Sequence, residues 1–390
     1  MKQNYRMRLR ALGGPLRLLW GGACAALGLL ALLPAPTAKL WEAAVGVTEF
    51  GHYLAALALL PWLPGRRRTA AGRLGALLGA VSAALSLTPL VRALPLARRL
   101  PARLDAAFGP ARLRPRAPLS LRSAFLGVAV RKAAPRTLVY RTVDGQPLTL
   151  DLYAAGGQAP APLVVVVHGG SWQSGDATQL AALNGYLADR GYAVAAISYR
   201  LAPRWIFPAA ADDLAAAIDF LKRQAGELGI DAARIALIGR SAGGQLALLQ
   251  AYTAHDPAIR AAIAFYAPFD MRYGYDHPAN PRVLDTRGVL EAYLGGTPQT
   301  ALATYEAASP IAFVGAQTPP TLLIHGPRDE LVTYRQSQLL AERLRVAGVP
   351  HLLLTLPWAT HGCDYNFSGP SGQLTTYAVE QLLDAQLRRA

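Results

Sequence analysis

The sequence is poor in cysteine and, over its first third, poor in acidic residues. Two cysteines, Cys24 and Cys363, stand in 390 residues, which excludes a fold held together by a set of disulfides. Up to residue 132 there are 20 lysines and arginines against three acidic residues, whereas the remainder has 19 against 21. The net charge of +15 therefore belongs to the N-terminal third, and the rest of the chain is close to neutral.

The basic residues of the first third flank apolar runs. Residues 18–33 and 74–91 carry no charge, and residues 40–64 between them are apolar apart from Glu42, Glu49 and His52. Each run is near the ~17–25 residues that span a bilayer. Arginines placed beside such runs are typical of membrane anchors, whereas a nucleic-acid-binding face carries them along a helix or sheet. We therefore expect about three transmembrane helices in residues 1–95, contact with membrane lipids and no nucleic-acid partner.

The first apolar run also resembles a secretory signal peptide. It has a basic start, an apolar stretch and small residues from Ala35 to Ala38. Two further apolar runs would still hold the cleaved product in the bilayer. A membrane-anchored protein is expected in either case.

The distribution of positive charge predicts an orientation. Five positive charges precede the first run and four lie between the second and third, whereas Lys39 alone lies between the first and second. This favours a cytoplasmic N-terminus and, with three crossings, an extracytoplasmic C-terminal domain. Four arginines after the third run, at positions 92, 98, 99 and 103, oppose that orientation and would suit two crossings. Long domains translocate largely regardless of their charge, so we expect a multi-pass protein with an extracytoplasmic C-terminal domain.

Glu49 and His52 lie three residues apart and would share one face of the middle run. Ionisable side chains inside a bilayer are costly, and a pair of them can be functional. The alternative expectation is that they pair with each other or lie near an interface. The sequence leaves the choice open.

The chain changes character after the apolar runs. Residues 96–134 are rich in proline, arginine and alanine and predict a basic linker with a helix that faces anionic lipid. From residue 135 the segments TLVYRTV and LTLDLYA flank Asp144 and Gly145, which predicts a hairpin. Apolar runs then alternate with helical stretches; the predicted strands are residues 163–167, 192–198, 235–238, 261–266, 321–324 and 352–356. Residues 135–390 therefore predict a mainly parallel sheet with helices on both faces.

A long insertion separates the fourth and fifth of these predicted strands. Residues 269–309 contain Met271, His277 and Tyr293 and no apolar run typical of a strand. Long insertions in compact domains are often lids over a site. We expect a cap that selects substrate, with a surface excursion away from the site as the alternative.

The hexapeptide GRSAGG, residues 239–244, lies between a predicted strand and a helix that begins at Ala242. A serine on such a tight turn has small neighbours and exposes its hydroxyl above the sheet. The pattern alone is weak evidence, but its place between strand and helix makes Ser241 a candidate nucleophile.

A serine hydroxyl attacks effectively only when a base removes its proton and a carboxylate orients that base. Two predicted strands end in such residues: LLIHGPRDE brings Asp329, and LTLPWATHG brings His361. Glu330 is the adjacent alternative to Asp329. The chain order Ser241, Asp329, His361 is that of hydrolases with a nucleophile elbow.

The run VVVVHGGSWQSGD, residues 164–176, ends a predicted strand in a glycine-rich loop. Attack on an ester carbonyl places negative charge on its oxygen, and losing one backbone amide that stabilises this charge costs about 2.7–4 kcal/mol. Because glycine lets the backbone approach closely, we expect amides from Gly169 and Gly170, together with that of Ala242, to form an oxyanion hole. Trp172 is expected to line the substrate pocket or to pack beneath the loop.

Five motifs together resemble a known family: HGGSW, SYRLAP with FPAAADD, GRSAGG, HGPRDELV and ATHG. In this order they are similar to the α/β-hydrolase superfamily, in its branch of HGGxW-type esterases near kynurenine formamidase, isoprenylcysteine methylesterase and the hormone-sensitive-lipase-like carboxylesterases. The resemblance covers residues 137–390 and implies the α/β-hydrolase fold. It also implies roles for six residues: Ser241 as nucleophile, His361 as general base and acid, Asp329 as its partner, and Gly169, Gly170 and Ala242 around the oxyanion.

The chain departs from the family pattern at two positions. Ser171 stands where the lipase-like group has a third glycine, which favours the HGGxW branch and leaves open which two loop amides act. Cys363 follows His361 where an aromatic or aliphatic residue is commoner, and its effect on the pocket is open.

These observations predict a membrane-anchored serine hydrolase that cleaves small or lipid-borne carboxylic esters through an acyl-enzyme on Ser241. No metal or organic cofactor is expected, because the three side chains suffice for the chemistry. An acyltransferase that uses the same triad is one alternative, and a catalytically silent α/β-hydrolase that only binds a ligand is another.

Overall fold

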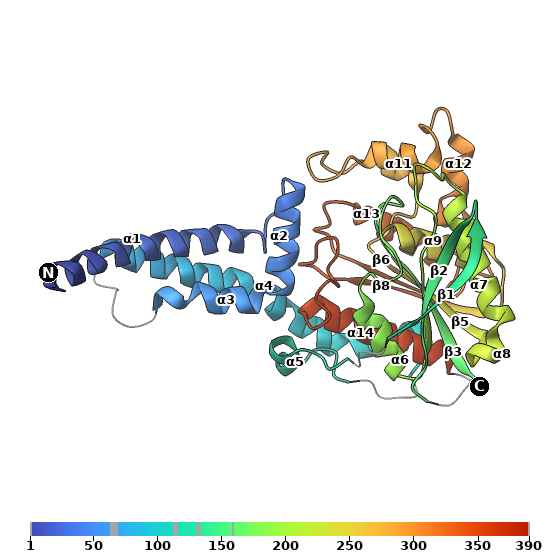
Figure 1. Cartoon of the computed structure of the whole chain (residues 1–390), viewed down its shortest axis with the longest axis horizontal. Coiled ribbons are helices and arrows are strands. Elements are labelled where there is room, and N and C mark those ends of the chain that lie inside the picture. Colours follow the sequence, from blue (N-terminus) through green and yellow to red (C-terminus); the bar gives the residue numbers. More distant parts are fainter. Residues whose placement is uncertain (1, 63–68, 112–115, 131–133, 158–159, 389–390) are drawn as a thin grey trace.

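A helical bundle and an α/β domain make up the protein (Figure 1). The computed structural model describes residues 2–62, 69–111, 116–130, 134–157 and 160–388. The bundle extends from one side of the α/β domain, and the N-terminus lies at its far end (Figure 1). A helix at the junction, α2 (Ala38–Glu49), crosses the direction of the bundle.

The α/β domain is built on one eight-stranded sheet with the order β1-β2-β4-β3-β5-β6-β7-β8. The first two pairings in this order, β1 with β2 and β2 with β4, are antiparallel, and the other five are parallel. The strands are β1 (Arg136–Val143), β2 (Gln146–Tyr153), β3 (Ala161–Val167), β4 (Ala193–Ile197), β5 (Ile230–Arg240), β6 (Ile259–Phe265), β7 (Thr321–His325) and β8 (His351–Thr355). The predicted mainly parallel sheet is therefore confirmed.

The predicted hairpin is present at its expected position. Asp144 and Gly145 join β1 to β2 with φ angles of 50° and 74°, which a two-residue turn with positive φ at both positions requires. Central strands such as β3 are buried along their whole length because helices cover both faces. Alternate residues of β3 accordingly enter two different cores, Val165 in one and Val164 in the other.

Helices on the two faces enclose these cores. One core includes α7 (Ala209–Arg223), α9 (Ala242–Thr253) and α13 (Arg335–Val346), and the other includes α6 (Ala181–Asp189) and α14 (Pro370–Leu387). Residues 209–228 form two helices, because the chain breaks at Gln224 between α7 and the short α8 (Ala225–Leu228). Residues that follow β3, β5 and β8 line one cleft together with Trp41 of α2, so the carboxyl ends of these strands lie at the edge of the domain next to α2.

The insertion after β6 folds into short helices on the same edge. These are α10 (Met271–Asp276), α11 (Thr286–Leu294), α12 (Leu302–Ala307) and a 3-10 turn at Pro310–Phe313. Met271, Leu290 and Tyr293 of this cap are buried in the core that contains α9. The cap is therefore packed onto the domain through apolar side chains.

The N-terminal bundle consists of α1 (Lys2–Leu29), α3 (Gly51–Ala58) and α4 (Ala70–Phe108), with a 3-10 turn at Leu60–Trp62. The middle span expected over residues 40–64 is wrong as a single helix, because the chain turns at Phe50 between α2 and α3. Glu49 ends α2, where its side chain is fully buried against Ser371 of α14. The polar contact to the α/β domain thus holds α2 across the base of the bundle.

Close backbone contact joins α1 to α4. A Cβ atom at Gly21 would lie 2.1 Å from the carbonyl oxygen of Gly75, and one at Gly75 would lie 2.3 Å from that of Arg17. Only glycine permits such an approach, and small residues at crossing points are typical of helices packed in membranes. Gly21 and Gly75, one in each apolar helix, therefore allow α1 and α4 to pack closely against each other.

The second half of α4 belongs to the α/β domain. Leu100, Leu104 and Phe108 are buried in the core beside α14. The boundary expected between residues 95 and 96 therefore lies inside one continuous helix, and the segment predicted as a linker begins with a core element. A short helix, α5 (Leu121–Leu126), follows and exposes Leu121, Phe125 and Leu126.

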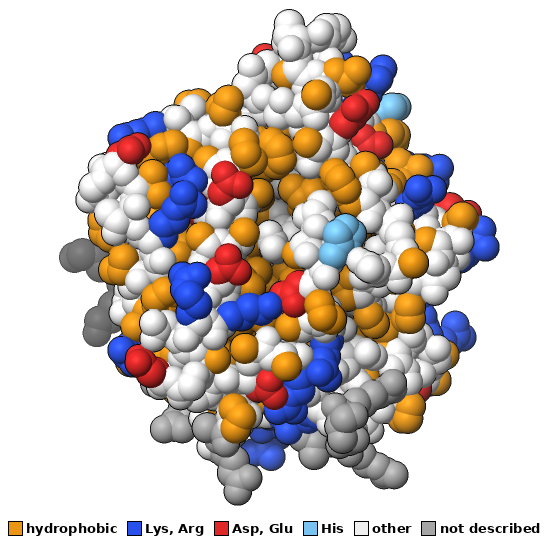
Figure 2. Space-filling model, turned by 90° about the vertical axis from the view of Figure 1, so that its right-hand side faces the viewer, with side chains coloured by type: hydrophobic (Ala, Val, Ile, Leu, Met, Phe, Trp, Pro, Cys, Tyr) orange, Lys and Arg blue, Asp and Glu red, His pale blue; other side chains and the backbone are white. Residues whose placement is uncertain are grey.

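Exposed apolar side chains are concentrated in the N-terminal part. Of the 28 large hydrophobic residues that are exposed in the described chain, 22 lie between Leu16 and Leu126. In contrast, Figure 2 shows Lys, Arg, Asp and Glu side chains interspersed over the face of the α/β domain opposite the bundle. Among the described residues, one helix, α4, is long and apolar enough to cross a membrane.

Candidate active site

Ser241 occupies a strained turn between β5 and α9. Its φ and ψ are 50° and −122°, a conformation that non-glycine residues rarely adopt and that is common at functional sites. The glycines of GRSAGG make the turn possible, since a Cβ at Gly239 would lie 2.0 Å from the oxygen of Gly243. A Cβ at Gly243 would lie 2.3 Å from the oxygen of His168. The turn places Ser241 immediately before the first residue of α9, as the motif predicts.

Three side chains far apart in the sequence meet at this turn. The Nε2 atom of His361 lies 3.0 Å from the Oγ atom of Ser241, and its Nδ1 atom lies 2.7 Å from Oδ2 of Asp329. His361 follows β8 and Asp329 follows β7, so the parallel sheet brings both loops to one edge. The structure thus joins the three predicted residues by hydrogen bonds in the order serine, histidine, carboxylate.

The carboxylate of Asp329 is held on all sides. Its Oδ1 accepts hydrogen bonds from the amides of Leu331 and Val332, and its Oδ2 contacts Nε2 of His325 at 3.0 Å as well as His361. Burial alone raises the pKa of this carboxyl, but the two histidines outweigh burial and hold the pKa well below its ordinary value. Asp329 therefore stays ionised beside His361, which fixes the imidazole tautomer.

Glu330, the alternative carboxylate, points elsewhere. Its Oε1 atom accepts a hydrogen bond of 2.9 Å from the amide of Ala35, in the turn between α1 and α2. The two adjacent carboxylates therefore have different partners: Asp329 contacts the histidine, and Glu330 contacts the N-terminal part of the chain.

The glycine-rich loop after β3 lies against Ser241. A Cβ at Gly169 would lie 3.3 Å from that of Ser241, and Gly170 has a φ of 122°. The amide of Gly169 donates to Oε1 of Gln179 at 2.8 Å, so the structure does not leave this amide free for a substrate. The amides of Gly170 and Ala242 have no hydrogen-bond partner among the described residues. These two amides are the better candidates for the oxyanion hole.

The rings around the loop fix its shape. His168 is buried, stacks on Tyr199 at 4.1 Å, and its Nδ1 atom lies 2.7 Å from the oxygen of Gly169. Burial lowers the pKa of His168, so its ring is held neutral. Trp172 is also buried, stacks on Tyr293 of the cap at 4.2 Å and donates from Nε1 to Gln245. Trp172 packs beneath the loop and also lines a cavity next to Ser241; its contact with substrate stays a prediction.

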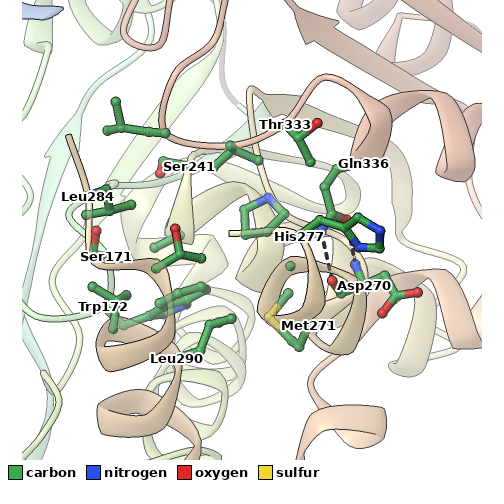
Figure 3. A pocket seen from close by; sticks show the side chains of 17 residues that line it. Ser171, Trp172, Ser241, Asp270, Met271, His277, Leu284, Leu290, Thr333 and Gln336 are labelled. Carbon is green, nitrogen blue, oxygen red and sulfur yellow. Dashed lines mark hydrogen bonds between the residues drawn. The ribbon is translucent and has the colours of Figure 1, made fainter. Parts of the chain in front are cut away.

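Two cavities meet at Ser241. A narrow one of about 50 Å³ lies under the cap (Figure 3), and a wider cleft of about 640 Å³ lies on the side of His361. Figure 3 shows Trp172, Leu290 and Met271 along the narrow pocket. The cap expected over residues 269–309 therefore lines the narrow pocket.

A buried network that the sequence did not indicate supports the histidine. The ring of Tyr266 lies tilted by 57° against that of His361, with the ring centroids 4.4 Å apart, and its hydroxyl donates to Oδ1 of Asp364 at 2.5 Å. The other oxygen of Asp364 accepts from Nε of Arg240, and all three side chains are buried. Because Arg240 precedes Ser241 and Asp364 lies three residues after His361, the network ties the two loops together. In the sequence, the only indication of this network is that Arg240 and Asp364 are charged residues close to Ser241 and His361.

The N-terminal part also reaches the site. Trp41 of α2 donates from Nε1 to the backbone oxygen of His361 at 3.1 Å, and its ring lines the wide cleft. Arg328, which precedes Asp329, donates to the oxygens of Leu30, Ala31 and Leu33 at the end of α1. No sequence pattern marked these contacts, because they join residues about 300 positions apart.

The polar pair of the middle run is separated. Glu49 contacts Ser371, and its backbone oxygen accepts from Asn366. His52 instead packs against the rings of Tyr53 and Phe125. Glu49 and His52 therefore have different partners, which argues against the alternative that they pair with each other; a place near a membrane interface stays a prediction.

Cys363 is buried and free. Burial raises the pKa of its thiol well above the ordinary value, and nearby Asp364 adds to the effect. The side chain is therefore kept as an unreactive thiol beside the site.

Comparisons with known proteins agree with this geometry. The family model described as BD-FAE matches residues 150–344. The chain is 32% identical over 382 residues to the probable carboxylic ester hydrolase LipM of Mycobacterium tuberculosis, covering 89% of this chain and 86% of LipM. It is also 32% identical over 241 residues to esterase LipC of the same organism, covering 58% of each chain.

Solved structures show the same fold. The thermophilic esterase Est2 of Thermogutta terrifontis superposes with a TM-score of 0.52 and 28% identity, over 63% of this chain and 89% of that chain. A bacterial heroin esterase superposes with a TM-score of 0.59 and 23% identity, over 77% of this chain and 98% of that chain, which speaks for the fold alone. The family model matches half of this chain, and the alignment with the ester hydrolase LipM covers 89% of it. The chain therefore belongs to the α/β-hydrolase esterases, in the hormone-sensitive-lipase-like branch, and is a carboxylic ester hydrolase.

Proposed function

We propose that the protein is a membrane-anchored carboxylesterase that works through an acyl-enzyme on Ser241. The observation that carries the proposal is the continuous hydrogen-bonded path from Ser241 through His361 to Asp329. In the first half of the reaction, His361 Nε2 takes the hydroxyl proton while Oγ bonds to the ester carbonyl carbon. The ester C–O bond then breaks, and the departing alcohol takes the proton back from His361.

The second half repeats the chemistry with water. His361 takes a proton from water as its oxygen attacks the acyl carbon, and the Oγ–acyl bond breaks as Ser241 regains its proton. The amides of Gly170 and Ala242 are proposed to stabilise the negative oxygen in both halves. Asp329 stabilises the positive imidazole that forms each time.

The N-terminal bundle is proposed to be the membrane anchor, in contact with membrane lipids. Support comes from the apolar helix α4 and from the concentration of exposed apolar residues in this part of the chain. The match to LipM covers 89% of this chain, more than the α/β domain contains, so the likeness extends into the N-terminal helices. Folded soluble proteins rarely leave so much apolar surface uncovered.

The anchor is proposed to be multi-pass, with the catalytic domain outside the cytoplasm. In the bundle α1 runs toward the α/β domain, α3 away from it and α4 toward it again (Figure 1). The N-terminus and the catalytic domain therefore lie at opposite ends of the bundle. Together with the excess of positive charge in the first part of α1, before its apolar run, this arrangement favours a cytoplasmic N-terminus.

A fluorophosphonate probe on membranes that contain the full chain tests the mechanism. We expect wild type and Ser123→Ala to be labelled and Ser241→Ala to be unlabelled, with ester hydrolysis following the label. Labelling that persists in Ser241→Ala would overturn the proposed nucleophile. Added methanol separates the acyltransferase: preferential formation of a methyl ester over the free acid would identify transfer as the main reaction.

A reporter fused after Ala390 tests the orientation. An alkaline phosphatase fusion should be active and a green fluorescent protein fusion dark, because the first folds outside the cytoplasm and the second inside it. The reverse pattern would contradict the proposed topology and leave the chemistry untouched.

A further inference from the structure

The two cavities divide the site into unequal halves. Both contain Ser241 together with Ser171, Leu284, Val289 and Leu331, so a single ester bound at Ser241 reaches into each of them. The narrow pocket measures about 50 Å³ and the wide cleft about 640 Å³. One side of the ester must therefore be small, and the other has room to be large.

The position of His361 decides which side is which. His361 lines the wide cleft and is absent from the lining of the narrow pocket. The alcohol oxygen must receive its proton from Nε2 of His361 as the ester bond breaks. The alcohol moiety therefore leaves through the wide cleft, and the acyl group points into the narrow pocket.

The narrow pocket fits a short acyl group. A cavity of about 50 Å³ is a few times larger than the roughly 10–15 Å³ that a single water needs, which suits an acyl group of a few heavy atoms. Its apolar walls include Trp172, Met271 and Leu290, which are buried and packed against the cap and the core. A long acyl chain would have to displace these side chains.

The wide cleft has a wall from the N-terminal part of the chain. Trp41 lies in its lining, with its ring 6.4 Å from that of His361, and Leu331 and Tyr365 lie in the same cleft. Tyr365 is 65% exposed, and Trp41 is half-buried. The cleft therefore has an apolar rim next to the base of the bundle.

The position of Trp41 is fixed by contacts at both ends of α2. Before the helix, Glu330 accepts from the amide of Ala35, and Arg328 holds the end of α1. At its other end, Glu49 accepts from Ser371. The wall is thus attached to the same loop that carries Asp329, and it does not move independently of the site.

From these contacts we infer that Trp41 is a specificity-determining residue on the alcohol side, and that the enzyme cleaves short-acyl esters of large apolar alcohols held at the membrane surface. The inference rests on the proposed function, because it uses His361 as the proton donor. It states which way the bound ester points, with its acyl group in the narrow pocket and its alcohol in the wide cleft. It also assigns a substrate contact to a residue outside the catalytic domain.

Two isomeric esters test the direction. Dodecyl acetate and ethyl dodecanoate have the same composition and similar partition into detergent, but their long chains lie on opposite sides of the ester. In detergent, the full-length enzyme should hydrolyse dodecyl acetate with a kcat/KM at least about tenfold higher than its kcat/KM for ethyl dodecanoate. A preference for ethyl dodecanoate, or equal rates, would overturn the inference while Ser241-dependent hydrolysis of ethyl acetate would still support the proposed mechanism.

Variants of Trp41 test the wall. Trp41→Ala should raise KM for dodecyl acetate and lower its kcat/KM about tenfold more than it lowers that for ethyl acetate, since an aromatic contact to the long alcohol is lost. Trp41→Phe keeps a ring and should retain most of the preference. Trp20→Phe is the matched control, because Trp20 also donates from Nε1 to a backbone oxygen, that of Leu57, within the bundle.

Fluorophosphonate labelling confirms that each variant is folded. If Trp41→Ala slows dodecyl acetate and ethyl acetate equally, Trp41 acts on His361 and not on the alcohol. If Trp41→Phe behaves as Trp41→Ala does, the hydrogen bond to His361 matters and the wall does not. Either result would overturn the inference.

Discussion

Two neighbouring carboxylates at positions 329 and 330 illustrate how much one residue position decides. Asp329 is fully buried, accepts two backbone amides and contacts two histidines, whereas Glu330 reaches the amide of Ala35. Both carboxylates follow the same strand, and their different directions come from the turn between β7 and α13. Burial and hydrogen bonding, more than residue type, assign Asp329 to the imidazole.

Asp329→Asn and Glu330→Gln form a matched pair of charge removals. We expect Asp329→Asn to lower kcat by about four orders of magnitude, because the amide favours the wrong imidazole tautomer. Glu330→Gln should keep kcat within a few fold, since its oxygen can still accept from Ala35. Steady-state hydrolysis of ethyl acetate measures both, and equal losses in the two variants would contradict the assignment of Asp329.

The raised pKa of Cys363 predicts slow alkylation. A thiol whose folded-state pKa lies above its ordinary value carries less thiolate at neutral pH, and thiolate is the reactive form. In a Cys24→Ser background, iodoacetamide at pH 8 should label the native protein at least about tenfold more slowly than the denatured protein. The native rate should rise with pH well beyond the range where the denatured rate levels off. Rapid native labelling would show that the thiol is accessible and ionised.

At the scale of elements, the helices of the bundle and the strands of the sheet follow different rules. The strands are specified by apolar runs and by glycine turns, which is why six of them lie within a few residues of their predicted positions. The apolar run over residues 40–64 fits one membrane helix by composition, but contacts of Glu49 with Ser371 and Asn366 turn the chain at Phe50. Those contacts come from α14 and the loop before it, which hydropathy does not report.

Adjacent glycines in α1 test the contact with α4. Gly21→Ala would place a Cβ 2.1 Å from the oxygen of Gly75 and should cost about 1–3 kcal/mol in the free energy of unfolding. Gly22→Ala meets nothing within 4 Å and should leave stability unchanged or slightly raised. Thermal unfolding of the full chain in detergent compares them, and equal midpoints would contradict the close packing.

At the scale of the whole molecule, the bundle and the catalytic domain are joined at the active site itself. Arg328 binds three backbone oxygens at the end of α1, Glu330 binds the next turn, and Trp41 reaches His361. The second half of α4 is also part of the domain core. An anchor attached in this way holds the cleft in a constant position relative to the bundle.

Arg328→Gln should loosen this junction. The variant removes a charged donor that satisfies backbone oxygens at a helix end, which costs about 1.5–3 kcal/mol for hydrogen bonds of this kind. We expect a lower thermal midpoint for the loss of fluorophosphonate labelling. Arg345→Gln is the control, because its pair with Glu342 is exposed and contributes little. A midpoint for Arg328→Gln equal to that of Arg345→Gln would show that the junction adds nothing to stability.

Local sequence patterns were enough to predict the mainly parallel sheet, the hairpin at Asp144, the serine turn, and the three residues that the structure joins. Each depends on short-range rules: strand and turn preferences, and residues placed at the ends of parallel strands. The folded chain was needed to show that the amide of Gly169 is occupied, that Tyr266 and Asp364 pack beside His361, and that Trp41 borders the cleft. These contacts depend on how distant segments pack, and packing is a property of the whole fold that no local pattern encodes.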